Sequence, residues 1–181
     1  EVTYLPVNKV GQITPQQLKK ALRADTILVS VMYANNETGV IFPIEEIGEI
    51  LADHQATFHT DAVQVYGKIP LNPKAANIDL LSISAHKING PKGVGFLYQK
   101  EGVKLAKILH GGSQEEKRRA GTENLVGIVG MASAIDFLTE EQQQINWEVY
   151  QQFHTYVLER LNQEGIQFEV NGDVEHHLPH I

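Results

Sequence analysis

The feature that most constrains this chain is an alternation between short apolar runs and segments with helical periodicity. Residues 26–33 form a nearly continuous apolar run, and the shorter segments 57–60 and 79–84 also have the composition of strands. Between the first two, residues 43–51 place isoleucine and leucine on one side of a helix. Parallel strands need long crossovers, usually helices, and strands buried on both faces are apolar throughout. The alternation therefore predicts an α/β fold with a mostly parallel sheet.

The remaining segments extend this pattern in both directions. Strands are predicted at residues 2–6, 93–98 and 167–170. A helix is predicted after Thr14, an N-cap residue that is followed by proline. Residues 125–161 are mostly helical in periodicity.

A domain boundary is expected within this long helical stretch. We assign residues 1–138 to part of a large domain and residues 139–181 to the start of a smaller α+β domain. The chain begins without methionine, inside a predicted strand, and its last residues, 177–181, form an apolar segment without a polar tail. Because natural termini are usually polar and frayed, we expect an internal piece of a longer protein with an incomplete sheet.

Composition excludes several classes of function within this chain. Lys and Arg number 15 against 22 Asp and Glu, so the net charge is −7, and neither nucleic acid nor a membrane is expected as a partner. The chain has no cysteine, which excludes disulfides, zinc–thiolate sites and a cysteine nucleophile. The histidine-rich residues 176–180 are interpreted as a surface segment because Pro179 breaks a helix there, and no metal site is predicted.

Short polar segments follow three of the predicted strands, at residues 35–37, 61–64 and 84–87. In open parallel sheets, ligands bind beyond the carboxyl ends of the strands. Lys87 can supply an amine for an aldehyde cofactor, and Asp61 can keep a pyridine nitrogen protonated so that the ring accepts electrons. This pairing is typical of sites for pyridoxal 5'-phosphate.

Three more side chains extend this hypothesis. Ser84 and His86 flank the lysine and can donate to a phosphate, and the amide of Gln64 can reach a phenolic oxygen of the ring. Taken singly, each of these residues is more typical of a solvated surface, and Asp61 can simply cap the helix that follows it. The hypothesis depends on several polar phrases at successive strand ends.

Four ordered motifs resemble one family of enzymes. Residues 84–93 read Ser-Ala-His-Lys-Ile-Asn-Gly-Pro-Lys-Gly, which matches a phrase of the class V aminotransferase-like enzymes, pyridoxal-phosphate enzymes of fold type I. The phrases at residues 35–39, 59–64 and 119–124 are similar to those of the cysteine desulfurases of the NifS and IscS group. The resemblance runs through the whole chain and covers less than half of a full-length member.

The resemblance implies the large domain of a fold type I transferase that depends on pyridoxal 5'-phosphate. Lys87 would bind the cofactor aldehyde and act as the base, and Asp61 would pair with the pyridine nitrogen. Gln64 would contact the phenolic oxygen, and Ser84 and His86 would bind the phosphate. The catalytic residues implied by the resemblance are therefore Lys87 and Asp61.

Two further positions complete the implied site. Asn36 would hydrogen-bond near the cofactor oxygen and the substrate carboxylate, and Thr122 would reach the phosphate of a neighbouring subunit, which implies a homodimer. Members of the group take sulfur from L-cysteine as an enzyme persulfide and leave L-alanine. The sulfur supplies an iron–sulfur scaffold or another acceptor protein. We expect a cytoplasmic sulfurtransferase of this kind.

The resemblance places the family's catalytic cysteine downstream of residue 181, so this chain alone is expected to be inactive. Two alternatives stay open. One is a relative with other chemistry, such as a selenocysteine lyase or an aminotransferase, and the other is a non-catalytic remnant that binds a partner. The Asn-Asn-Glu-Thr-Gly phrase at residues 35–39 favours the desulfurase. An aminotransferase needs no such cysteine, and a remnant would show no visible absorption band.

Overall fold

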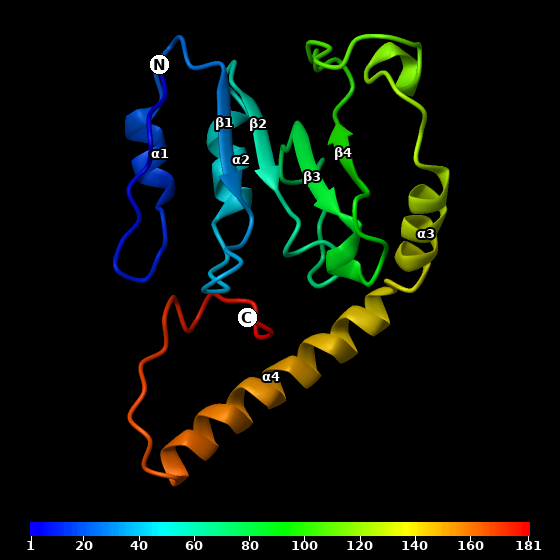
Figure 1. Ribbon diagram of the computed structural model, residues 1–181. Coiled ribbons are helices and arrows are strands. Elements are labelled where there is room, and N and C mark those ends of the chain that lie inside the picture. The colour runs from blue at the N-terminus through cyan, green and yellow to red at the C-terminus, as the bar shows by residue number, and fades with distance from the viewer.

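The computed structural model describes residues 1–181 and contains one four-stranded sheet (Figure 1). Strands β1 (Leu28–Met32), β2 (Thr57–Asp61) and β3 (Leu80–Ser84) are parallel neighbours. Strand β4 (Gly95–Gln99) pairs antiparallel with β3, which gives the order β1-β2-β3-β4. The predicted α/β fold with a mostly parallel sheet is confirmed.

Helical segments connect the strands and extend beyond the sheet (Figure 1). Thr14 caps the first one as predicted: its Oγ1 accepts the N–H of Gln17 at 3.2 Å, and Gln17 Oε1 accepts the N–H of Thr14 at 2.7 Å. No helix combines the length and the apolar character that a membrane span requires. The helical segments are α1 (Pro15–Ala21), α2 (Ile44–Leu51), η1 (Ala85–Ile88), η2 (Glu115–Lys117), α3 (Leu125–Asp136) and α4 (Glu140–Gln163).

One face of the sheet is buried against α2. Along β2, Phe58 and Thr60 are fully buried, whereas His59 and Asp61 lie on the opposite, more open face. Ile47 of α2 packs into the same apolar core as Phe58. Figure 1 shows α2 behind β1 and β2, with no helix crossing in front of them. The two-residue period of the strand therefore leaves the face that carries His59 and Asp61 accessible.

Three predictions about strands need correction. Residues 2–6 and 167–170 are not strands, because no strand of this chain lies beside them for their backbone groups to pair with. The apolar run at residues 26–33 does contain β1, but this strand is not buried on both faces. Leu28 and Met32 are exposed because they lie on the open face of the sheet, the face that also carries His59 and Asp61.

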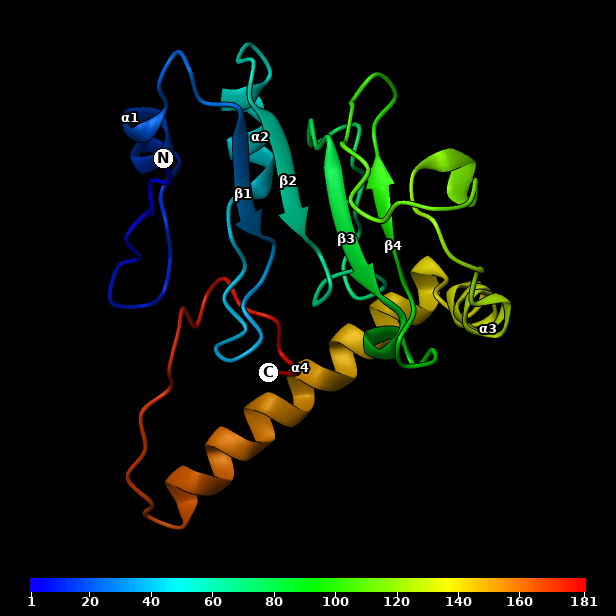
Figure 2. The ribbon, with the colours of Figure 1, turned by 45° about the horizontal axis from the view of Figure 1, so that its top comes forward.

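The chain leaves the sheet through α4 and then returns to it. Helix α4 begins after its cap Thr139, runs below the carboxyl ends of the parallel strands (Figures 1 and 2) and has no buried residue. The last residues come back: His177 bridges Val40, and Leu178 is fully buried in the main core. The interpretation of residues 176–180 as a surface segment is therefore wrong, because the apolar Leu178 draws this segment into the core and only His176 is exposed. The proposed division after residue 138 falls in the connection between α3 and α4, and it stays a prediction.

The hydroxyl of Thr60 leads to a prediction about stability. Its Oγ1 is buried and has no hydrogen-bond partner. A buried polar group without a partner costs free energy, so Thr60→Val should raise the free energy of unfolding by about 1 kcal/mol. Urea unfolding measures this change, with Thr57→Val on the other face of β2 as the control. A lower stability in Thr60→Val would contradict the prediction.

Candidate active site

The parallel pairing brings the ends of three strands to one edge of the sheet. Asp61, the last residue of β2, lies between Met32 of β1 and Ser82 of β3 in the register. Its carbonyl oxygen accepts the N–H of Tyr33 at 2.8 Å, and the next amide, Ala62 N–H, donates to Ser82 O at 3.0 Å. The polar phrases that follow these strands therefore share the edge at which open parallel sheets bind ligands.

Asp61 keeps part of its carboxylate free. Its Oδ1 accepts the N–H of Val63 at 3.0 Å, and its other oxygen has no hydrogen-bond or ion-pair partner. Three residues further on, Gln64 is buried in the turn after β2, and its side-chain amide makes no hydrogen bond. Both groups are thus available to a ligand at this edge.

The polar residues after β3 lie in a tight turn. Ser84 ends the strand, and η1 carries His86 and Lys87, both exposed. Asn89 closes the turn in the left-handed conformation with φ 63°, which asparagine tolerates better than most residues. The side chains of Ser84, His86 and Lys87 have no partner within the chain, so their donors remain free.

The other two predicted site residues, Asn36 and Thr122, come from other segments of the chain. Asn36 is exposed in the turn that follows β1, where its amide donates to Glu37 Oε1 at 3.0 Å. Thr122 is exposed in the segment between η2 and α3, beyond β4 (Figure 1). Asp61 and Gln64 thus follow β2, the residues of η1 follow the adjacent strand β3, and Thr122 lies in a segment beyond β4 (Figure 1).

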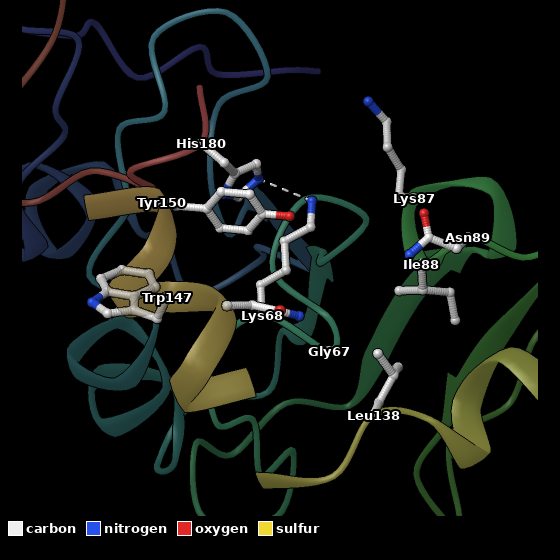
Figure 3. Close-up of a pocket in the computed structure, with 10 residues that line it drawn as sticks. Gly67, Lys68, Lys87, Ile88, Asn89, Leu138, Trp147, Tyr150 and His180 are labelled. Carbon is white, nitrogen blue, oxygen red and sulfur yellow. Dashed lines mark hydrogen bonds between the residues drawn. The ribbon is translucent and has the colours of Figure 1, made fainter. Parts of the chain in front are cut away.

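A cavity of about 160 Å³ opens beside Lys87 (Figure 3). Figure 3 shows Lys68 reaching towards His180 beside the Tyr150 ring, with Lys87 on the opposite wall. Of the predicted site residues, only Lys87 lines this cavity. The other side chains that line it were not identified from the sequence; they include Lys68, Asn89, Asn146, Trp147, Tyr150 and His180.

Lys68 and His180 form the polar contact of this cavity. Lys68 Nζ lies 3.0 Å from His180 Nε2, and neither residue has a carboxylate partner. Burial, and then the positive charge of Lys87, lower the pKa of Lys68 to about 8. Burial also lowers the pKa of His180 to about 4, with smaller effects from Lys68 and Lys87. The sequence analysis missed Lys68; its position four residues after Gln64, in the same turn, is the one signal that could have identified it.

An amine and a partly free carboxylate follow neighbouring parallel strands, at the end of the sheet where open α/β folds bind ligands. The comparison with protein families identifies the class of protein. Residues 1–181 match the family described as aminotransferase class-V. The chain belongs to this family, and its mostly parallel sheet is of the kind found in fold type I enzymes.

Proteins similar to this chain include curated ones named as IscS and solved structures described as NifS-like. A protein of Bacillus subtilis (strain 168) named as an IscS is 56% identical over 181 residues, which are 100% of this chain and 48% of that protein. Among solved structures, a NifS-like protein superposes with a TM-score of 0.91 at 37% identity, over 99% of this chain and 49% of the other. A structure described as SspA in complex with cysteine has a TM-score of 0.74 at 39% identity, over 82% of this chain and 44% of the other. The chain thus spans about half the length of the curated relatives it matches.

The low pKa of His180 predicts a dependence of stability on pH. The folded state takes up this proton only near pH 4, whereas an unfolded histidine takes it up near 6.5. Between these values the unfolded state binds more protons, so stability falls as the pH is lowered from 6.5 to 4. His180→Gln should lose less stability than the unmodified protein between pH 7 and pH 5 in urea unfolding. The exposed His110→Gln is the control, and equal losses in both variants would contradict the prediction.

Proposed function

We propose that the full-length protein containing this chain is a cysteine desulfurase that depends on pyridoxal 5'-phosphate. The observation that carries the proposal is the set of polar groups after β2 and β3 that make no hydrogen bond within the chain: one oxygen of Asp61, the amide of Gln64, and the side chains of Ser84, His86 and Lys87. The names of the similar proteins support it, and so does the neighbour solved with cysteine. L-Cysteine is the proposed substrate.

The residues present fit the cofactor. The free oxygen of Asp61 suits a protonated pyridine nitrogen, and the amide of Gln64 suits the phenolic oxygen. Ser84 and His86 supply donors for the phosphate, and the Lys87 amine suits the aldehyde. Because none of these groups is used inside the fold, binding breaks no interaction that the fold needs.

Each side chain then has a defined task. When bound, pyridoxal phosphate supplies an electron-withdrawing ring next to the substrate Cα. Lys87 holds the cofactor and then removes the α-proton of the amino acid through Nζ. Asp61 keeps the proton on the ring nitrogen, and Asn36 orients the substrate carboxylate.

The sulfur transfer needs a group outside this chain, which has no cysteine. In the proposed reaction the C–S bond of L-cysteine breaks as its sulfur bonds to a cysteine thiolate elsewhere in the full-length protein. The carbon that loses sulfur is protonated, which gives L-alanine. The persulfide formed on the protein then passes sulfur to an iron–sulfur scaffold or another acceptor protein, in the cytoplasm.

We also propose that the protein is a homodimer with shared sites. Helix α3 exposes apolar side chains, among them Leu125, Val126 and Val129, directly after the segment that carries Thr122. A second copy seated there would cover this apolar surface and bring Thr122 to the partner's phosphate. Residues 1–138 would form the cofactor-binding domain, and residues 139–181 would begin the smaller one.

The assignment of Lys87 is tested by absorption. The full-length protein with pyridoxal phosphate should show a visible band from the cofactor bound to the lysine, and Lys87→Ala should remove it. Lys92→Ala, which changes an exposed lysine five residues away, is the matched control and should keep the band. A band that survives in Lys87→Ala would show that another amine holds the cofactor.

The assignment of Asp61 is tested by turnover. Asp61→Asn keeps the size of the side chain but cannot hold the ring nitrogen protonated. Cofactor binding should remain measurable, while the release of alanine from L-cysteine should fall by about 100-fold or more. Normal turnover in this variant would remove Asp61 from its role.

A further inference from the structure

A chain of hydrogen bonds crosses the three parallel strands on the open face of the sheet. His59 Nδ1 lies 2.8 Å from Ser30 Oγ of β1, and His59 Nε2 lies 2.9 Å from Ser82 Oγ of β3. One ring nitrogen donates and the other accepts, since a serine hydroxyl can do either. The imidazole therefore joins β1, β2 and β3 through side chains, next to the site.

This chain runs directly beside Asp61. His59 and Asp61 are two residues apart on β2 and so lie on the same face of the sheet. Ser82 is the register partner of Asp61, so its side chain and the carboxylate are neighbours on adjacent strands. Nevertheless the Ser82 hydroxyl is bound to His59, and one oxygen of Asp61 is without a partner.

The surroundings of the imidazole also favour its uncharged form. Burial lowers the pKa of His59, and this effect exceeds the opposing influence of the Asp61 charge. A neutral ring beside the carboxylate leaves its negative charge uncompensated. Both the charge and one oxygen of Asp61 are thus kept for a group from outside the chain.

We propose that His59 is a positioning residue for Asp61: it holds the Ser82 hydroxyl away from the carboxylate, so that the acid remains free for the ring nitrogen of the cofactor. This inference rests on the proposed function, because it assumes that Asp61 meets a pyridine nitrogen. Without the imidazole, the Ser82 hydroxyl is released beside Asp61 and donates to it. The serine then competes with the cofactor for the same oxygen.

Cofactor binding to the full-length protein tests the inference through a pair of ligands. Pyridoxal phosphate has the ring nitrogen, and its 1-deaza analogue has carbon in that place. His59→Leu should weaken the binding of pyridoxal phosphate by about tenfold, which corresponds to one lost hydrogen bond to a charged group. The same variant should change the affinity for the analogue by less than about twofold.

A second substitution tests the competition directly. His59→Leu combined with Ser82→Ala removes the competing hydroxyl and should restore most of the affinity for pyridoxal phosphate. His59→Gln, whose amide can still engage the Ser82 hydroxyl, should bind the cofactor within about threefold of the unmodified protein. Thr60→Val, on the buried face of the same strand, is the matched control and should change neither affinity.

The outcomes distinguish an error in the role of His59 from an error in the proposed function. If His59→Leu weakens both ligands equally, or if Ser82→Ala restores nothing in that background, His59 has only a structural role and the inference is wrong, while the proposed function stands. If the unmodified protein binds no pyridoxal phosphate, the proposed function is wrong and the inference falls with it.

Discussion

The structure depends on the parallel pairing that places Met32, Asp61 and Ser82 side by side at the ends of three strands. A crossover connects each parallel strand to the next, so the carboxyl ends of all three strands lie at the same end of the sheet. Residues that are about 25 positions apart in sequence thereby become neighbours. The proposed contacts of the Asp61 carboxylate and the Lys87 amine with the cofactor both start from this register.

The site is built from groups that the fold leaves unused. The side-chain amide of Gln64 makes no hydrogen bond within the chain, and the exposed Lys87 has no counter-charge. The open face of β2 shows the complementary arrangement, since there Ser30, His59 and Ser82 satisfy one another. Polar groups are therefore divided between those that hold the strands together and those that remain free to bind a ligand.

Several elements could be predicted because the signals are local. The Thr14 cap, the apolar side of α2 and the run that contains β1 depend on residues close together in sequence. The predicted strands at residues 2–6 and 167–170 were wrong for the opposite reason. Their composition suits a strand, but a strand exists only where a neighbour receives its hydrogen bonds, and none lies beside them.

The sequence by itself determined the α/β alternation, the polar phrases at the strand ends and the lysine–acid pair, because periodicity and motif spacing lie within single elements. Only the tertiary structure decided that Ser82 turns to His59 and leaves Asp61 free. It alone also brought His180 to Lys68 across 112 positions of the chain. Such contacts follow from strand register and from the path of α4, which no local pattern encodes.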